Sequence, residues 1–185
     1  MNAPLPHSMT PQSIQRCLTR MAHEILEAND EVEELLLVGI HAGGVPLASR
    51  IADLIEQSEG VRPHVGEMDI TLYRDDLYTG LERPVLGETR IPVGLKGRTV
   101  VLVDDVLFTG RTVRAALDEL MDYGRPDRIQ LAVLVERGHR ELPIEANFVG
   151  RRMDTEKKDR VQVSVGEKAS DNDGVRIERQ GEVLS

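Results

Sequence analysis

Cysteine, tryptophan and long apolar runs are scarce or absent in this chain of 185 residues. Cys17 is the single cysteine, which excludes an intrachain disulfide and a zinc site built on several thiolates. No stretch reaches the ~18 consecutive apolar residues of a membrane-spanning helix, and residues 1–13 lack the basic and apolar regions of a secretory signal. These absences predict a cytoplasmic protein that has no membrane partner.

Aromatic side chains and positive charge are limited as well. Aromatic residues make up 3% of the chain, too few for a sheet that binds single-stranded nucleic acid by stacking successive bases. The 32 acidic residues outnumber the 23 basic ones and give a net charge of −9, which excludes indiscriminate binding to phosphate backbones or anionic membranes. Any contact with a polyanion must therefore be local.

The apolar residues that are present predict a single α/β domain over residues 1–185, because a chain of this length is close to the usual size of one domain. Three short, continuous apolar runs are typical of strands that are buried on both faces, and a fourth segment alternates as a half-buried strand does. Apolar residues at helical spacing, with Thr10 as an N-cap, predict helices between them. The predicted strands are residues 35–40, 65–73, 99–103 and 129–135, and the predicted helices are residues 11–28, 45–57 and 112–123.

Strands that alternate with helices indicate an open, mostly parallel sheet flanked by helices. Residues 161–184 contain two alternating segments across an acidic turn and predict a C-terminal β-hairpin added to this fold. Residues 74–98 are rich in charge, glycine and proline, and such a segment is long for an idle loop, so we expect a mobile lid. Residues 1–9 are expected to form a flexible tail.

The most informative segment follows the predicted strand 99–103. Two adjacent acids, Asp104 and Asp105, end that strand, and the sequence Thr-Gly-Arg-Thr at residues 109–112 begins the next helix. N–H groups at a helix N-terminus and threonine hydroxyls suit a phosphomonoester, and Gly110 permits a tight turn close to it. Two carboxylates beside such a site accept hydrogen bonds from vicinal sugar hydroxyls or hold Mg²⁺. Phosphate, diol and Mg²⁺ together describe a phosphorylated ribose.

Other interpretations of these motifs are weaker. Acids at strand ends often cap turns, so Asp104 and Asp105 alone would leave a structural role open, but the attached phosphate-binding pattern favours function. Gly39 and Gly44 have the spacing of a nucleoside-triphosphate loop, yet Val45 stands where that loop needs lysine. The chain contains no G-x-G-x-x-G pattern, which removes the dinucleotide-binding interpretation.

Residues 100–112 resemble the phosphoribosyl-diphosphate motif of type I phosphoribosyltransferases. Residues 69–77 and 124–143 further resemble the bacterial pyrimidine-operon attenuation regulators that double as uracil phosphoribosyltransferases, and the similarity covers roughly residues 10–180. The resemblance implies the type I phosphoribosyltransferase fold. It also implies a protein that senses UMP or UTP, binds a stem-loop in pyrimidine-biosynthesis mRNA, and makes UMP and diphosphate from uracil and phosphoribosyl diphosphate.

The resemblance implies a role for each matching residue. Asp104 and Asp105 would bind the ribose hydroxyls and, partly through the substrate, Mg²⁺, while residues 109–112 would hold the 5′-phosphate. Arg74, on the rim of the predicted lid, would act in catalysis when closure excludes water. The implied substrate-binding residues are His41, Ala42, Gly43, Gly44, Val106, Leu107, Phe108, Thr109, Gly110, Arg111, Thr112 and Arg137.

The turn at residues 41–44 aligns with the diphosphate-binding loop of the family but departs from its pattern, because many members have a basic residue at the position of Gly43. Backbone N–H groups could still bind diphosphate, with His41 adding a pH-dependent charge, but one electrophilic side chain is missing. The alternative interpretation is that Gly43 and Gly44 serve only a tight turn from strand to helix.

Phe108 bears on the choice of base. Purine-specific relatives have an acid immediately before Thr-Gly, whereas Phe108 can pack against a base but cannot hydrogen-bond to it, so a 6-oxopurine is disfavoured. Uracil needs alternating donors and acceptors along one edge, which the backbone around residues 135–138 could supply.

For RNA, the resemblance points to polar and basic residues, namely Thr19, Arg20, His23, His139, Arg140 and Arg151. Residues 151–160 hold five basic residues against three acids, a local positive excess in an acidic chain. Ordinary solvated surface is the alternative for any one of these residues taken alone. A homodimer or higher homo-oligomer would double such a patch.

Three functions are consistent with these features. The first is a Mg²⁺-dependent uracil phosphoribosyltransferase, and the second is an RNA-binding regulator whose pocket binds UMP with little or no turnover. These two are compatible, and we favour a regulator that retains transferase activity. A purine-salvage phosphoribosyltransferase is the third and least favoured function.

Overall fold

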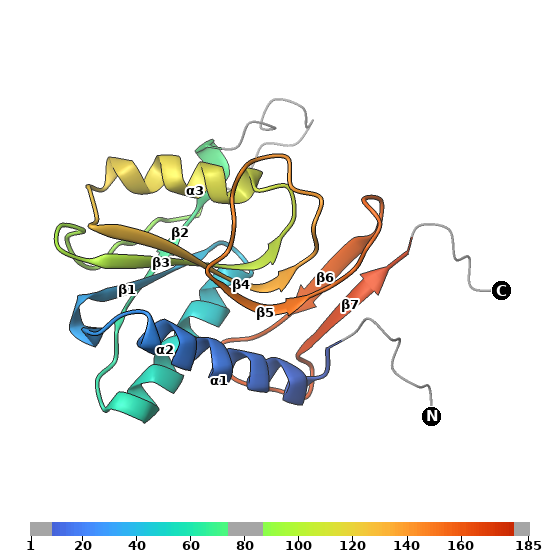
Figure 1. The fold of residues 1–185 in the computed structure, drawn as a ribbon, viewed down its shortest axis with the longest axis horizontal. Helices are drawn as coiled ribbons and strands as arrows, with labels where there is room; N and C mark the ends of the chain where they lie inside the picture. The colour runs from blue at the N-terminus through green and yellow to red at the C-terminus, as the bar shows by residue number, and fades with distance from the viewer. Residues whose placement is uncertain (1–8, 74–86, 180–185) are drawn as a thin grey trace.

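The computed structural model describes residues 9–73 and 87–179 and has a five-stranded parallel sheet at its centre (Figure 1). The strand order is β2-β1-β3-β4-β5, and every neighbouring pair is parallel. A separate antiparallel pair, β6 and β7, follows at the C-terminal end. The elements are α1 (Pro11–Glu27), η1 (Val32–Glu34), β1 (Leu35–Ile40), α2 (Gly44–Glu59), β2 (His64–Met68), η2 (Ile70–Tyr73), β3 (Thr99–Leu107), α3 (Arg111–Asp122), β4 (Arg128–Glu136), β5 (Phe148–Arg152), β6 (Arg160–Ser164) and β7 (Gly174–Glu178).

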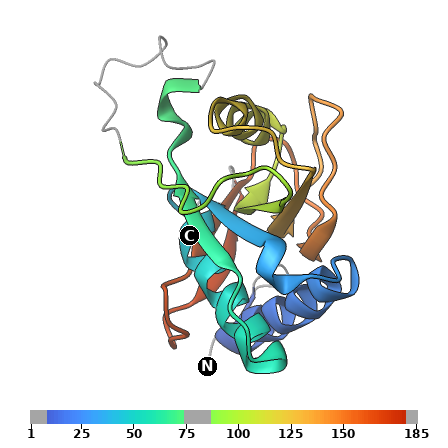
Figure 2. The same ribbon diagram turned by 90° about the vertical axis from the view of Figure 1, so that its left-hand side faces the viewer.

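The sheet has helices on both faces, with α1 and α2 on one side and α3 on the other (Figure 2). All six residues of β1 are buried, because alternate side chains enter two different cores. Leu35 and Leu37 pack in the core with α1 and α2, whereas Leu36 and Val38 pack in the core with α3. This two-sided cover explains why the strand is continuously apolar, and it confirms the predicted α/β fold.

The first helix illustrates how local signals set the element boundaries. The side chain of Thr10 accepts a hydrogen bond from the Ser13 N–H at 3.2 Å, and Pro11 occupies the first turn, where its missing N–H costs nothing. The predicted apolar stripe that includes Ile14 and Leu18 is fully buried. The helix prediction is therefore confirmed, with an end at Glu27.

Two predicted strand boundaries are wrong. The strand predicted at residues 99–103 continues to Leu107, because the backbone beyond Val103 keeps pairing with β4. The strand predicted at residues 65–73 ends at Met68 and gives way to the short helix η2. The cause lies in Asp69, whose carboxylate accepts a hydrogen bond from the Thr71 N–H at 2.9 Å and turns the chain.

The edge strand β5 was not predicted at all. Its residues pair with β4 in parallel, with Val133 opposite Val149 and Val135 opposite Arg151. Phe148 and Gly150 are buried while the last two residues are exposed, so the segment lacks the continuous apolar run by which the other strands were identified. Its strand conformation depends on the neighbouring strand rather than on a local pattern.

The predicted C-terminal hairpin is confirmed as β6 and β7, and it packs on the side of the sheet that carries α1 and α2. Val175 is fully buried and pairs through its backbone with Met9, which is itself buried although it falls in the predicted flexible tail. The loop before β7 is anchored by a buried ion pair at 2.6 Å between Arg50 of α2 and Asp173. The remaining residues of the predicted tail, 1–8, lie outside the described residues.

Within residues 87–98, the described part of the predicted lid, the chain pairs with the outer edge of β2 at Arg90. Arg90 exchanges two backbone hydrogen bonds with Glu67, and Leu95 is buried in the core beneath α3. Residues 74–86 and with them Arg74 lie outside the described residues, so lid movement stays a prediction. Among the helices of the described chain, none is long and apolar enough to cross a membrane.

The buried ion pair between Arg50 and Asp173 gives a stability prediction. We expect Asp173→Ala to lower the free energy of unfolding by ~3–5 kcal/mol, because it leaves the Arg50 guanidinium buried without its anion. Asp53→Ala is the matched control, since the ion pair of Asp53 with Arg62 is exposed and its loss should cost below ~1 kcal/mol. Urea titration followed by circular dichroism measures both values, and equal losses would contradict the prediction.

Candidate active site

The strand order places the carboxyl ends of β1 and β3 side by side, with Gly39 of β1 opposite Val103 of β3. From β1 the chain winds outward to β2 in one direction, and from β3 it winds to β4 in the other. Ligands of open α/β sheets bind in the crevice outside such a point of reversal. The predicted diphosphate turn at residues 41–44 and the predicted ribose-phosphate loop therefore lie at the same edge of the sheet.

The turn and the loop are in direct contact through glycine. A Cβ atom added to Gly43 would lie 2.5 Å from the Asp105 Cγ, and one added to Gly44 would overlap the carbonyl oxygen of Val103. At Gly44 the neighbour is backbone, so only glycine fits there, whereas a side chain at Gly43 would require the Asp105 carboxylate to move. The peptide bond between His41 and Ala42, in the same turn, is cis.

Asp104 and Asp105 lie within β3 rather than after it. Asp104 is 6% exposed, Asp105 is half-buried, and the Asp105 N–H donates to Asp104 Oδ1 at 2.9 Å. Burial, reinforced by the neighbouring charge of Asp105, raises the pKa of Asp104 well above its usual value, and burial also raises the pKa of Asp105. Two carboxylates held in this way are suited to bind hydroxyl donors or a cation that stabilises their ionised form.

The predicted phosphate cradle is formed by residues 108–110 and the start of α3. Gly110 adopts a left-handed conformation with φ of 91° at the N-cap of α3, and it offers no side chain to cap the helix. The carbonyl of Thr109 accepts hydrogen bonds from Glu141 N at 2.9 Å and Leu142 N at 3.2 Å, which fixes the loop from behind. Within the described chain, the first-turn N–H groups of Thr112 and Val113 thus have no side-chain acceptor and can bind an anion.

Phe108 and Arg137 form a flat wall at the carboxyl ends of β3 and β4. The Arg137 guanidinium stacks over the Phe108 ring at 4.1 Å, and the ring of His139 meets the same Phe108 edge-on at 6.0 Å. Hydrogen bonds to Thr155 Oγ1 at 3.2 Å and to the Glu156 carbonyl at 2.8 Å hold Arg137, which is buried. Burial lowers the pKa of Arg137, and its two hydrogen bonds hold the planar guanidinium over the Phe108 ring.

The six predicted RNA-binding residues fall into two groups. Thr19, Arg20 and His23 line a groove of about 670 Å³ along α1. Arg20 also reaches β5, where it donates to the Gly150 carbonyl at 2.6 Å, and Arg151 of the same strand donates to Ser13 of α1 at 2.9 Å. The first group therefore spans α1 and the exposed edge strand.

The second group lies at the carboxyl ends of β4 and β5. His139 and Arg140 line a groove of about 310 Å³ there, together with Arg152. Both arginines form ion pairs with the buried carboxylate of Glu136, and the ring of His139 hydrogen-bonds the Thr155 carbonyl at 2.7 Å. Arg151 and Arg152 are successive residues of β5 that contact different partners, Ser13 and Glu136, so β5 joins the two groups.

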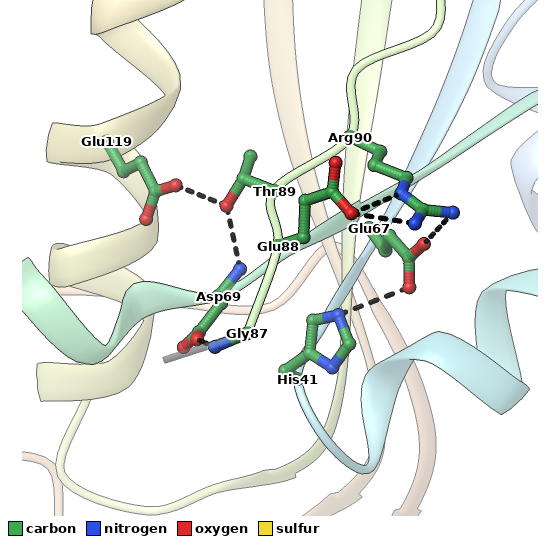
Figure 3. A network of polar contacts seen from close by, with 8 residues as sticks. All are labelled: His41, Glu67, Asp69, Gly87, Glu88, Thr89, Arg90 and Glu119. Carbon is green, nitrogen blue, oxygen red and sulfur yellow. Dashed lines mark hydrogen bonds and ion pairs between the residues drawn. The ribbon is translucent and has the colours of Figure 1, made fainter. Parts of the chain in front are cut away.

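Polar contacts that were not predicted link His41, the end of β2, residues 87–90 and Glu119 of α3 (Figure 3). His41 Nε2 lies 3.2 Å from Glu67 Oε2, and the other oxygen of Glu67 lies 3.7 Å from an Arg90 nitrogen. Thr89 accepts a hydrogen bond from the Asp69 N–H at 2.9 Å and donates to Glu119 at 2.5 Å.

These contacts had no signal in the sequence. Glu67 belongs to a predicted strand, but its position beside His41 depends on the pairing of β1 with β2. Thr89 and Glu119 are 30 residues apart in the chain. Tertiary structure alone brings such residues together.

A family model described as "Phosphoribosyl transferase domain" matches residues 10–168. Proteins named "Bifunctional protein PyrR" match nearly the whole chain. The relative from Clostridium novyi is 55% identical over 166 residues, which cover 90% of this chain and 93% of the relative. The relative from Thermus aquaticus is 58% identical over 159 residues, which cover 86% of this chain and 88% of the relative. The chain belongs to the phosphoribosyltransferase family, among the bifunctional PyrR proteins. This confirms the resemblance identified from residues 100–112.

Solved structures share the phosphoribosyltransferase fold at low sequence identity. A hypoxanthine-guanine phosphoribosyltransferase from Bacillus anthracis has a TM-score of 0.64 at 16% identity, covering 82% of this chain and 86% of that chain. A hypoxanthine phosphoribosyltransferase from Staphylococcus aureus has a TM-score of 0.64 at 20% identity, covering 84% and 85%. These likenesses establish the fold and leave the choice of base to the residues of the site.

The contact between Gly43 and Asp105 gives a second prediction. We expect Gly43→Ala to lower the free energy of unfolding by ~1–3 kcal/mol, since the added methyl group must displace the Asp105 side chain or the turn. Gly94→Ala is the control, because a Cβ there meets no atom within 4 Å, and its effect should stay within ~0.5 kcal/mol. Chemical denaturation of both variants tests this, and an unchanged Gly43→Ala would show that the close approach is absent in solution.

Proposed function

We propose that this chain regulates pyrimidine-biosynthesis operons by binding leader mRNA in response to UMP or UTP, and that it transfers the phosphoribosyl group of phosphoribosyl diphosphate to uracil. The observation that most supports this proposal is that three features lie at one edge of the sheet. They are the Asp104–Asp105 pair, the glycine turn and the uncapped start of α3. Identity of 53–58% to PyrR proteins supports the regulatory half.

In the transfer, the bond between ribose C1′ and a diphosphate oxygen breaks, and its electron pair leaves with diphosphate. A bond from uracil N1 to C1′ forms, and the N1 proton is released to solvent. No protein nucleophile is needed, so the residues act by orientation and by stabilising departing negative charge. Asp104 and Asp105 would hold the ribose hydroxyls, and the α3 N-terminus with Thr109 and Thr112 would hold the 5′-phosphate.

The donor atoms at this site fit Mg²⁺, which prefers oxygen ligands. In the described part of the chain no group of three or more His, Cys, Asp and Glu side chains is placed to hold a metal ion. Asp104 and Asp105 would therefore share the ion with substrate oxygens rather than bind it alone. When bound, Mg²⁺ would neutralise charge on the leaving diphosphate.

Phe108 and Arg137 support a pyrimidine as the acceptor. The stacked pair presents a flat surface without a carboxylate for a purine ring. Backbone groups of residues 135–138 at the end of β4 would bind the uracil edge. A purine-salvage enzyme remains the less favoured alternative.

Turnover distinguishes the candidate functions. Incubation with phosphoribosyl diphosphate, Mg²⁺ and uracil should yield UMP, whereas hypoxanthine and guanine should yield no nucleotide. The absence of UMP above background would remove the transferase and leave a regulator without turnover. Formation of IMP or GMP at a higher rate than UMP would instead establish purine salvage.

Ligand protection tests the role of the two acids. The raised pKa values of Asp104 and Asp105 mean that the folded protein favours their protonated forms. Their contribution to the stability of the fold is therefore lost as the pH rises through those values. Asparagine side chains do not ionise, so they avoid this loss. The double variant Asp104→Asn, Asp105→Asn should therefore unfold no earlier than wild type at pH 7.5.

Phosphoribosyl diphosphate with Mg²⁺ at about 100 times its Kd should raise the wild-type Tm by ~5–10 °C and the Tm of the double variant by less than ~1 °C. Arg20 lies on α1 and contacts β5, away from the proposed ribose site, so Arg20→Ala should show the full wild-type rise in Tm. A full shift in the double variant would contradict the proposed ribose site.

RNA binding is proposed for the surface that joins the two basic groups, and a homodimer or higher homo-oligomer would extend it. Arg20→Ala should weaken binding to a pyrimidine-leader stem-loop about tenfold, because it removes a cation at the α1–β5 junction. Arg128→Ala removes the same charge at the opposite, amino-terminal end of β4 and should change binding less than ~2-fold.

Filter binding at two salt concentrations, with and without UMP, measures these effects. Wild-type binding should tighten with UMP and weaken as salt rises. Indifference to UMP would remove the sensor function, and equal losses in the two variants would place RNA elsewhere.

A further inference from the structure

We propose that Glu67 is a positioning residue of the diphosphate site, and that it orients His41 so that the imidazolium takes the place of the basic side chain that is absent at Gly43. This inference rests on the proposed transferase function. It concerns a contact between β1 and β2 that the sequence does not suggest, and it assigns a cation to a turn that otherwise offers only backbone N–H groups.

Both the backbone and the ring of His41 are held by the end of β2. The His41 N–H donates to the Met68 carbonyl at 2.8 Å, and His41 Nε2 lies 3.2 Å from Glu67 Oε2. Among the described residues, the second ring nitrogen has no hydrogen-bond partner, and it faces away from Glu67 (Figure 3). One nitrogen thus fixes the ring, and the other remains to donate to an anion.

Glu67 is itself held from the other side. Its backbone exchanges two hydrogen bonds with Arg90, at 2.8 and 3.0 Å, and its Oε1 lies 3.7 Å from the Arg90 guanidinium. Arg90 is further bound to Glu88 at 2.7 Å. The two oxygens of Glu67 are therefore divided between His41 and Arg90, which sets the direction of the carboxylate.

Charged groups lie near His41. Glu67 and Asp69 act on it from the end of β2, Arg90 contacts the far oxygen of Glu67, and Asp105 lies against Gly43 in the same turn. Burial opposes ionisation of Asp69, but hydrogen bonds from Thr71 and Gly87 outweigh burial and lower its pKa.

Among the described residues, the contact that holds the His41 ring is therefore the carboxylate of Glu67. Histidine ordinarily changes charge between about pH 5 and 8, so the turn should bind diphosphate more tightly on the acid side of that range.

The test measures affinity for inorganic diphosphate with Mg²⁺ by calorimetry on the full chain at pH 6 and pH 8. The ratio of wild-type to variant affinity cancels the titration of diphosphate itself. We expect His41→Gln to bind about tenfold more weakly than wild type at pH 6 and within about twofold at pH 8. Glu67→Gln should lose about fivefold at pH 6, because its amide replaces the charge-assisted contact that orients the ring by a weaker one.

Glu34→Gln is the matched control. Glu34 also contacts an arginine, Arg98 at 3.3 Å, but it precedes β1 at the opposite end of the sheet, so its affinity should equal that of wild type at both pH values. Urea denaturation of all variants shows whether each is folded. Glu67→Asp should recover part of the affinity at pH 6, which a merely structural role would not predict.

A wild-type pH profile in Glu67→Gln would overturn the inference, and so would a loss of the same size at pH 6 and pH 8. The outcome is separable from the proposed function. If wild type forms no UMP but binds diphosphate with the expected pH dependence, the transferase fails and the role of Glu67 stands. If wild type forms UMP but His41→Gln and Glu67→Gln leave the affinity for diphosphate unchanged, the proposed role of Glu67 is wrong and the transferase function stands.

Discussion

The close approach of a glycine turn to two buried carboxylates is the constraint on which the site depends. Asp104 and Asp105 lie inside the sheet, where burial disfavours their ionised form. A Cβ atom at Gly44 would overlap the Val103 carbonyl, and one at Gly43 would displace the Asp105 side chain. Such a site gains most from a ligand that supplies hydroxyl groups and a metal ion.

The same turn carries the departure from the family pattern, because Gly43 has no basic side chain. A side chain at Gly43 would displace the Asp105 carboxylate from its position. His41 lies two residues earlier, and its ring contacts Glu67 on the neighbouring strand. Because the direction of the ring comes from β2 and residues 87–90, the chemistry of the turn depends on elements that are distant in the sequence.

The site and the basic surface share one structural support, the end of β4. Arg137 follows β4 and stacks on Phe108 in the ribose-phosphate loop. Glu136, the last residue of β4, binds Arg140 and Arg152 on the basic surface. The end of β4 therefore contacts both the proposed ribose-phosphate loop and the proposed RNA-binding surface.

Local sequence determined the parts of the protein whose physics is local. The continuous apolar run of β1, the N-cap at Thr10 and the acids followed by Thr-Gly-Arg-Thr at residues 109–112 each carry their own signal, so the sheet, its helices and the ribose-phosphate loop could be predicted. Family resemblance then supplied the implied function. The strand predicted at 99–103 was given too early an end, because two adjacent acids are typical of a strand terminus. In the structure, pairing with β4 continues past both acids.

Tertiary structure decided the features that depend on neighbours. β5 is a strand because β4 offers it a hydrogen-bonding edge, not because its own residues form an apolar run. The contact of His41 with Glu67 and the exclusion of a side chain at Gly44 exist only once β1, β2 and β3 are aligned. A sequence specifies which groups are available, but distances between groups on different strands are set by pairing and packing. For this protein, that alignment is what turns a recognisable motif into a site of particular charge and shape.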